Sequence, residues 1–486
     1  MSLMEPLANR LSGQTALHGH SAKSQKVGDI SRCSTPAKSL VMPCYPEYKD
    51  SRVAWLGEVP AHWDVKPVKA VASCNDEVLE ESTLADYEIE YVEISGVDAG
   101  RGITSTEIIP FGNAPSRARR CLKDGDVLVS TVRTYLRAIA LVITPPENMI
   151  ASTGFAVIRP RSVTPHFLGY LFQSEFLIAE VIARSVGVSY PAINASDLMR
   201  LHVPIPMREE QSAIAAFLDR ETGKIDALVA EQEKLIRLLR EKRQAVISHA
   251  VTKGLPSTGS GQAAARMKDS GIEWLGEVPA HWEIKRLGML SSQIQTGPFG
   301  SQLHAEDYVE NETPVINPSN INDGKFYPDW SCTVGEEIVE RLSQHKLIVG
   351  DIVFARRGEM GRCALVSENE AGWLCGTGSL NVRLNTHVSA EFVDIYLRTP
   401  YVRELLKLES VGSTMDNLNT EILSKVPVPV PPILEQTAIA AFLDRQTTKL
   451  DALTAEAQRG IELLKERRSA LISAAVTGKI DVRGAS

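Results

Sequence analysis

The chain has 486 residues, three to four times the usual size of one domain, so we expect several folded units. Hydrophobic residues make up 43% and charged residues 23%, proportions typical of soluble globular proteins, which exclude a wholly disordered or collagen-like chain. The formal net charge of -8 argues against a basic coat, but a DNA-binding protein needs only local positive areas.

Residues 1–44 are mostly small and polar, with little periodicity, and are predicted to form a flexible tail. They contain no apolar core of a secretion signal, and no later segment has the roughly 20 apolar residues of a membrane span. The seven cysteines are scattered without C-x-x-C spacing, which favours reduced thiols and predicts no metal site. A cytoplasmic protein is expected.

An internal duplication is the strongest pattern in the chain. Residues 49–63 and 268–282 are identical at twelve of fifteen positions, and both contain the segment W-L-G-E-V-P-A-H-W. A second pair follows at residues 211–228 and 436–453. The sequences between these blocks differ, which predicts one frame that carries two different contact surfaces. Neutral drift of an old duplication is the alternative.

The repeat divides the chain into folded domains and long helices. We expect a first mixed domain at 45–206, a helix at 207–253, a linker at 254–267, a second domain at 268–431, a helix at 432–477 and a tail at 478–486. Proline-rich segments precede both helices, and Gly254 and Gly478 follow them, as start and stop signals do.

Apolar residues at heptad spacing predict that the two helices pair with each other. The predicted seam on the first helix consists of Leu218, Ile225, Leu228, Leu235, Leu239 and Val246. The predicted seam on the second helix consists of Leu443, Leu450, Leu453, Leu464 and Leu471. Charged residues between them are expected to form i,i+4 pairs and to border the seam.

The short linker determines how the helices run. The 13 residues from Leu255 to Met267 span at most about 45 Å, whereas each helix is about 65–70 Å long. The second domain should therefore lie at the far end of the first helix, and the second helix should return. The expected fold is α+β, with two tandem α/β domains separated by an antiparallel coiled coil and related by a pseudo-two-fold axis.

Basic residues gather at equivalent places in the two variable regions. Arginine suits both phosphate contacts and the reading of guanine in the major groove, so these clusters are candidate DNA contacts. The candidates are Arg117, Arg119, Arg120, Arg133, Tyr135 and Arg137 in the first copy, and Lys346, Arg356, Arg357 and Arg362 in the second. Residues 76–98 carry nine acids and no lysine or arginine, and should face away from DNA or towards a protein.

No common catalytic motif is present. The chain lacks a phosphate-binding G-x-x-x-x-G-K-[ST] loop, an H-E-x-x-H helix and a G-x-S-x-G elbow. Asn317-Pro318-Ser319 begins like the N-P-P-aromatic loop of amino-methyltransferases, but the second proline and the aromatic residue are missing. The chain is therefore not expected to be an enzyme.

The combined motifs resemble the DNA-specificity subunit of type I restriction–modification enzymes. The resemblance rests on W-L-G-x-V-P-x-H-W at 55–63 and 274–282, and on P-x-P-P-x-x-E-Q-x-x-I-A-x-F-L-D at 206–219 and 432–444, each followed by a long L-L-x-E-[KR]-R helix. It covers nearly everything from Tyr45 to Lys479. The first copy departs from the pattern at Met207-Arg208, and the tail has no counterpart.

The resemblance implies that each variable half is a target recognition domain for one half of a bipartite site on double-stranded DNA. It implies that the paired helices act as a ruler and bind two adenine-N6 methyltransferase subunits, which ATP-driven restriction and translocation subunits then join. This chain would bind no cofactor, since S-adenosylmethionine and ATP belong to those partners. A coiled-coil scaffold that binds only proteins, or an enzyme with an unrecognised site, remains the alternative.

Overall fold

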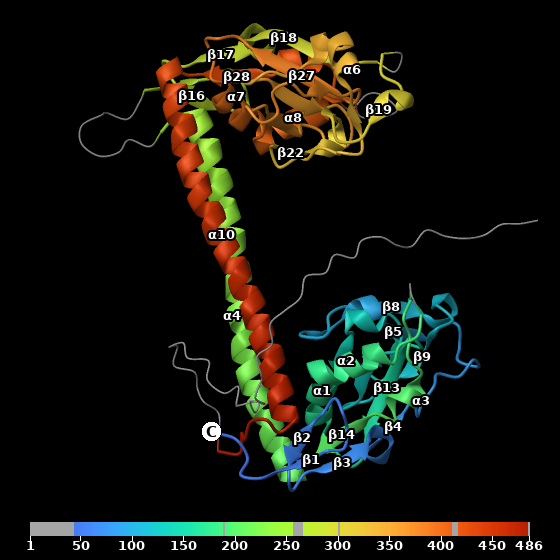
Figure 1. The fold of residues 1–486 in the computed structure, drawn as a ribbon. Helices are drawn as coiled ribbons and strands as arrows, with labels where there is room; N and C mark the ends of the chain where they lie inside the picture. The colour runs from blue at the N-terminus through green and yellow to red at the C-terminus, as the bar shows by residue number, and fades with distance from the viewer. Residues whose placement is uncertain (1–42, 188–189, 256–265, 300–301, 411–416, 485–486) are drawn as a thin grey trace, which may run out of the picture.

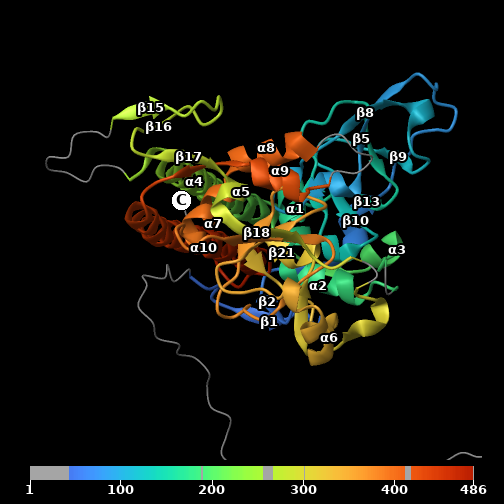
Figure 2. The same cartoon turned by 90° about the horizontal axis from the view of Figure 1, so that it is seen from above.

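The computed structural model describes residues 43–187, 190–255, 266–299, 302–410 and 417–484. Two mixed α/β domains stand at opposite ends of a rod of two long helices (Figure 1). Seen along the rod, both domains project to the same side of it (Figure 2). The predicted fold class is confirmed. Residues 1–42 of the predicted tail and 256–265 of the predicted linker lie outside the described residues.

The rod consists of α4 (Arg208–Lys253) and α10 (Ile433–Val476). Each helix begins within two residues of a proline, which does not fit inside a helix and so marks its start. Each helix also carries glutamate in its first turn, where the helix dipole favours negative charge. With 46 and 44 residues, they are about 65–70 Å long.

Two ion pairs cross the rod and show that its helices are antiparallel. Asp226 of α4 pairs with Arg468 of α10 at 2.9 Å, and Arg243 of α4 pairs with Asp451 of α10 at 2.9 Å. The residue number rises along one helix as it falls along the other. The two pairs occupy equivalent positions of the repeat, as an internal two-fold axis requires. The sequence predicts i,i+4 pairs within each helix and charges that border the seam, and Arg243 and Arg468 border the seam and pair across it.

The predicted seam is wrong at three leucines. Leu228, Leu235 and Leu453 are 51%, 42% and 50% exposed, whereas the other predicted seam residues are buried or partly buried. Ile236 of α4 packs instead with Ala457 and Ile461 of α10. Successive helical residues lie about 100° apart, so the true contact stripe passes through Val229 and Ile236, one residue after the leucines that we chose.

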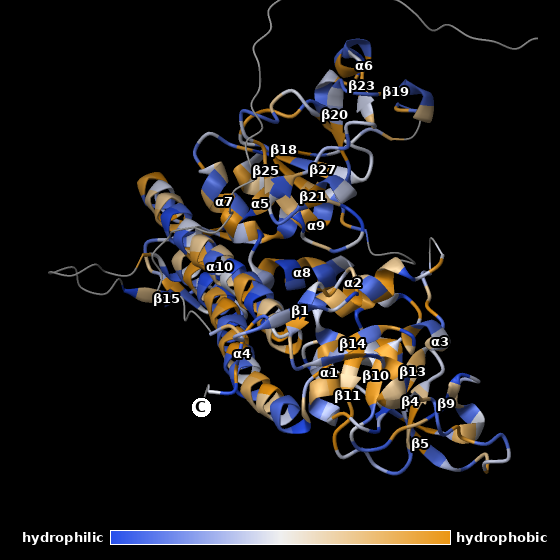
Figure 3. Ribbon diagram, turned by 60° about the horizontal axis from the view of Figure 1, so that its bottom comes forward, coloured by the Kyte–Doolittle hydropathy of each residue, from blue (hydrophilic) through white to orange (hydrophobic). Residues whose placement is uncertain are grey.

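The first domain contains two four-stranded sheets. One has the order β11 (Ile139–Leu141), β10 (Val127–Ser130), β13 (Phe155–Pro160) and β4 (Ala72–Cys74). The other has the order β8 (Glu107–Pro110), β5 (Glu88–Val92), β12 (Met149–Ser152) and β9 (Ala118–Cys121). The helices are α1 (Pro165–Gln173), α2 (Glu175–Ala183) and α3 (Ala195–Leu198). Strands β10, β13 and β4 are mostly hydrophobic, whereas hydrophobic and hydrophilic residues alternate along the helices of the rod (Figure 3).

The second domain repeats this plan. Its sheets have the orders β18 (Ser291–Thr296), β27 (Ser379–Leu384), β24 (Ile352–Ala355), β25 (Cys363–Leu365), and β19 (Tyr308–Val309), β23 (Thr333–Val334), β20 (Thr313–Ile316), β26 (Leu374–Cys375). Its helices are α5 (Leu287–Leu290), α6 (Glu336–Arg341), α7 (Ala390–Leu397), α8 (Pro400–Ser410) and α9 (Thr420–Lys425). Helix α8 and the hairpin of β21 (Ile321–Asn322) and β22 (Lys325–Phe326) lie on the side turned towards the first domain (Figure 1).

A short two-stranded ladder leads from each domain into its rod helix. In the first domain β3 (Asp64–Pro67) pairs with β14 (His202–Ile205), and in the second β17 (Glu283–Arg286) pairs with β28 (Pro427–Val430). The repeated motifs lie just before these ladders. The first motif overlaps the hairpin of β1 (Tyr48–Asp50) and β2 (Glu58–Pro60). The second motif overlaps the hairpin of β15 (Met267–Asp269) and β16 (Glu277–Pro279).

The repeated motif binds both rod helices. His62 contacts Glu210 in the first turn of α4 at 2.9 Å, and His281 contacts Glu435 in the first turn of α10 at 2.8 Å. The end of the opposite helix reaches the same motif. A Cβ atom on Gly478, after α10, would clash with the ring of Pro60 and would lie 3.2 Å from the buried Trp63, so a larger residue would not fit there.

The structure differs from the tail predicted at 478–486. Gly478–Gly484 packs on the first domain, where Val482 is buried and Tyr48 donates its hydroxyl to the Gly478 carbonyl at 3.0 Å. Asp481 donates its N–H to the Pro43 carbonyl at 2.7 Å, so Pro43 also belongs to the folded part. Residues 478–484 are too few to show a hydrophobic periodicity from which their burial could be predicted.

Candidate nucleic-acid interface

One loop of the first domain brings three of the candidate residues together. The strand β10 is fully buried, and the chain leaves it through Thr131–Arg137, which contains the single turn Thr134–Leu136. Arg133 and Arg137 flank this turn with φ of 51° and 54°. This left-handed conformation costs a non-glycine residue about 1–3 kcal/mol, so the loop holds its arginines under strain.

Hydrogen bonds fasten this loop to residues 185–187 and 190–193. Arg133 donates its N–H to the Pro191 carbonyl, and Ile193 donates its N–H to the Thr131 carbonyl, both at 2.8 Å. The buried Thr134 hydroxyl lies 2.8 Å from the Ser185 hydroxyl. The two segments therefore form one stiff support.

Large side chains project from this support. Tyr135 and Leu136 are half exposed, and Tyr190 is 65% exposed. The Arg133 guanidinium lies 4.9 Å from the centroid of the Tyr190 ring, a cation–π contact. We call Arg133, Tyr135, Leu136, Val186 and Tyr190 the first loop surface. Arg137 turns aside and pairs with Glu175 of α2 at 2.5 Å.

Sequence reasoning missed Leu136, Val186 and Tyr190. The one available signal was the echo between Ser185-Val186-Gly187 and Ser410-Val411-Gly412, which marks the supporting segment without indicating its role. Residues 411–416 lie outside the described residues.

The second domain places Arg356, Arg357 and Arg362 in the equivalent loop after β24. The Arg356 Nε donates to the Leu418 carbonyl at 3.1 Å, and burial lowers the pKa of its guanidinium. Arg357 is exposed and forms no ion pair with another described residue. Arg362 donates to the Ile321 carbonyl at 3.3 Å. Lys346 lies before the other end of β24, so the structure separates it from these arginines.

The same position of this loop carries a positive φ in both copies. In the second copy it is Gly358, with φ of 81°, where the first copy has Arg133. The next residues also differ, because the counterparts of Tyr135 and Leu136 are the buried Met360 and Gly361. The two loops thus leave equivalent strands and share one left-handed position, but they carry different side chains.

Of the remaining candidate arginines, Arg117 and Arg119 are engaged within the first domain, whereas the Arg120 Nε has no hydrogen-bond partner among the described residues. Arg117 pairs with Glu93 and donates to the Tyr91 hydroxyl at 3.3 Å, which raises the pKa of its guanidinium. Arg119 lies over the Phe111 ring at 4.9 Å. Arg120 has a buried Nε. Part of the acidic block 76–98 thus lies against this basic cluster.

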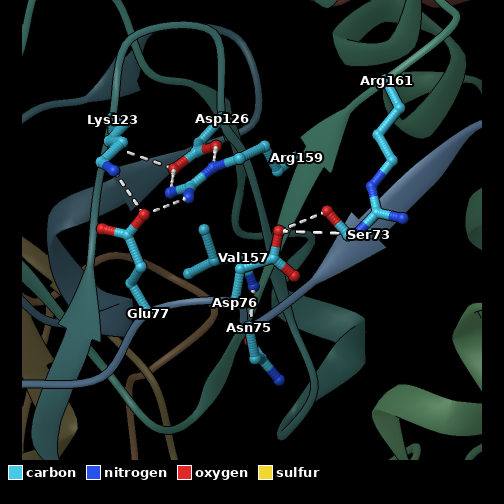
Figure 4. A network of polar contacts seen from close by, with 9 residues as sticks. All are labelled: Ser73, Asn75, Asp76, Glu77, Lys123, Asp126, Val157, Arg159 and Arg161. Atoms are coloured by element: carbon cyan, nitrogen blue, oxygen red, sulfur yellow. Dashed lines mark hydrogen bonds and ion pairs between the residues drawn. The ribbon is translucent and has the colours of Figure 1, made fainter.

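A polar network around the buried Asp126 fixes the start of β10 (Figure 4). Arg159 donates through Nε and Nη2 to both oxygens of the buried Asp126, each at 2.8 Å, and through Nη1 to Glu77. Lys123 also pairs with Glu77, and this hydrogen bond is the main cause that lowers the pKa of the Glu77 carboxyl. Asp351 and Arg383 repeat the central pair in the second domain, at 2.7 and 2.8 Å.

The other sequence features find structural places. Asn317 and Asn320 cap each other's backbone in the turn Pro318–Asn320, so the amide of Asn317 serves this turn. Within the described residues, no group of three or more His, Cys, Asp or Glu side chains is placed to hold a metal ion. None of the described helices could cross a membrane.

Known proteins share this organisation. The family model for the type I restriction modification DNA specificity domain matches residues 63–237 and 279–463, one match in each half. The chain is 24% identical over 441 residues to the putative type I restriction enzyme MjaX specificity subunit of Methanocaldococcus jannaschii, covering 88% of this chain and 96% of that protein. The EcoKI specificity subunit of Escherichia coli K12 is 22% identical over 338 residues, 67% of this chain and 68% of that protein.

Solved structures show the same fold. One chain, described under the structural basis of complex assembly and conformational transition of the type I R-M system, matches with a TM-score of 0.63 at 24% identity. The match covers 86% of this chain and 98% of that chain.

Proposed function

Because the chain belongs to the type I restriction–modification DNA specificity family, we propose that it is the DNA-recognition subunit of such an enzyme. It reads a bipartite site on double-stranded DNA, with one half-site for each domain. Partner subunits then methylate adenine at N6 or cut the DNA. The chain supplies recognition, and the chemistry belongs to the partners.

The observation that carries this proposal is one fold repeated at both ends of the rod, with different side chains on the equivalent loops. Arg133, Tyr135 and Leu136 stand in the first loop, where Gly358, Met360 and Gly361 stand in the second. Different side chains on the same support give different base preferences, because base edges are read by hydrogen bonds and apolar contacts from individual side chains. The rod fixes the gap between the two half-sites.

The rod also offers two equivalent surfaces for protein partners. The exposed leucines share one face on each helix, since Leu228, Leu235 and Leu238 recur at steps of seven and three on α4. Leu453 and Leu463 occupy the equivalent positions of Leu228 and Leu238 on α10 and are also exposed. Apolar stripes of this kind suit amphipathic helices of a partner. Two related stripes would bind two methyltransferase subunits.

Cofactors follow from this division of labour. S-adenosylmethionine would bind to the two methyltransferase subunits, and ATP would bind to the restriction and translocation subunits. Neither would bind to this chain.

The test is to express the chain with its neighbouring methyltransferase subunit in a host without adenine methylation and to map N6-methyladenine across the genome. We expect a split motif of two short half-sites around a fixed gap. Co-purification without methylation would favour a protein scaffold, and absence of both would contradict the proposal.

The partner surfaces can be tested in the same system. Leu238→Glu or Leu463→Glu alone should reduce the complex from two methyltransferase subunits to one, as measured by light scattering. Ile108→Glu, at an exposed apolar residue of β8 away from the rod, is the matched control and should leave two.

A further inference from the structure

The loop after β10 exposes an apolar tip that the equivalent described loop of the second domain, at residues 356–362, lacks. Tyr135 and Leu136 are both half exposed at the end of the turn that follows Arg133. Their counterparts are Met360, which is 6% exposed, and Gly361, which has no side chain. Both loops share a left-handed residue before the turn, but only the first contains the single turn Thr134–Leu136 that carries the exposed side chains.

The backbone conformation of Arg133, at the base of the tip, suits glycine better than arginine, which indicates that the arginine side chain has a function. Arg133 adopts a left-handed conformation that favours glycine, and the second copy has glycine at this position. Glycine would relieve the strain here. The arginine side chain instead lies over Tyr190, and it forms no ion pair with an acid among the described residues. It is therefore available to a negatively charged partner.

The tip cannot fold away into the domain. Its turn is fastened by the hydrogen bonds from Arg133 to Pro191 and from Ile193 to Thr131, and the buried Thr134 fills the space beneath it. A stiff apolar point beside a free arginine has the composition of side chains that enter between base pairs, where the apolar group unstacks a step and the cation contacts the phosphate.

We infer that the turn Thr134–Leu136 is a wedge that enters the duplex at the half-site read by the first domain and unstacks one base step there. This inference rests on the proposed function. Its occupant is duplex DNA, because the free charge next to the tip is positive. Unstacking lowers the cost of moving a neighbouring base out of the helix, which a methyltransferase requires. The second domain reads its half-site without such a wedge.

The test uses the assembled complex with its methyltransferase subunits and a duplex that carries the motif mapped by methylation. 2-Aminopurine, which brightens when it is unstacked, replaces one base at a time outside the target adenines. The variant is Tyr135→Ala/Leu136→Ala. The control is Leu84→Ala/Tyr87→Ala, which removes an exposed leucine and an exposed tyrosine elsewhere in the same domain.

In the wild-type complex, we expect 2-aminopurine fluorescence to rise at one base step of each half-site in which an adenine is flipped out. In the wedge variant, this rise should be lost in one half-site only. Its Kd for the duplex should rise by about tenfold or more, as expected for the loss of a stacking contact, while the control should match the wild type.

Three outcomes would overturn the wedge. The variant could keep every fluorescence signal, it could lose the signals of both half-sites equally, or it could lose its methyltransferase subunits on gel filtration, which would make the tip a protein contact. Failure of the proposed function is distinguishable, because the wild-type complex would then neither bind nor methylate the bipartite duplex.

Discussion

At the scale of single residues, each domain contains an equivalent ion pair with a buried aspartate. Asp126 is 1% exposed and accepts two hydrogen bonds from Arg159, and Asp351 stands in the same relation to Arg383. The loop that presents Arg133 begins directly after the strand that Asp126 fixes. Removal of one partner from a buried pair leaves the other charge without compensation, which costs more than the pair itself contributes.

We therefore expect Asp126→Asn to lower the free energy of unfolding of the first domain by about 3 kcal/mol. Scanning calorimetry of the full chain would measure it as a lower Tm of one transition, and Asp351→Asn should lower the transition of the other domain. Asp64→Asn is the control, because Asp64 pairs with Lys66 at the surface and should change stability by less than about 1 kcal/mol. An equal effect of both substitutions in the first domain would contradict this account.

The sequence predicts one half of this pair and not the other. Gly125-Asp126-Val127 and Gly350-Asp351-Ile352 are visible as an echo, but Arg159 lies 33 residues further on, and only the sheet brings it to Asp126. The same limit applies to the candidate site. Arg117 is a sound candidate for DNA until the fold places Glu93 beside it. Composition indicates which residues carry charge, and tertiary contacts decide which charges are free.

At the scale of elements, the rod shows what periodicity can and cannot predict. Prolines and glycines place both helix ends within a residue or two, since they act through the local backbone. The contact face is harder to predict, because leucine and a β-branched neighbour are equally apolar. The pairs Leu228-Val229 and Leu235-Ile236 each offered two choices 100° apart, and the partner helix selects the second.

This register makes a direct prediction about stability. Ile236→Ala should lower the free energy of unfolding by about 2–4 kcal/mol, because it leaves a cavity beside Ala457 and Ile461. Leu228→Ala, on the exposed face of the same helix, is the matched control and should cost less than about 1 kcal/mol. Urea denaturation followed by circular dichroism would measure both. If Leu228→Ala were the more destabilising of the two, the seam originally predicted would be the true one.

At the scale of the whole molecule, the rod holds its register through its ends. The beginning of α4 and the end of α10 lie in the core of the first domain, and the end of α4 and the beginning of α10 lie in the core of the second. The polar pairs Arg243–Asp451 and Arg468–Asp226 lie between these anchors. Neither helix can therefore slide without leaving a core, and the distance between the domains changes only when both helices change together.

This arrangement predicts how insertions alter the DNA site. Duplication of 229–235 in α4 and of 454–460 in α10 adds one heptad to each helix and lengthens the rod by about 10.5 Å, equivalent to about three base pairs. Three base pairs also turn the second half-site by about 100° around the duplex, since a full turn takes about 10–10.5 base pairs. Three heptads in each helix add about 31.5 Å, close to nine base pairs and nearly one full turn.

We expect the three-heptad variant to methylate the same two half-sites with a gap that is about nine base pairs longer, and the one-heptad variant to lose most of its methylation. Genome-wide mapping of N6-methyladenine would read out both. Three heptads in α4 alone are the control, and they should abolish folding of the rod, because the end of α4 would no longer reach its place in the second domain. If the longer rod methylated the original gap, base-pair spacing would be set by the domains and the rod would serve only to bind partners.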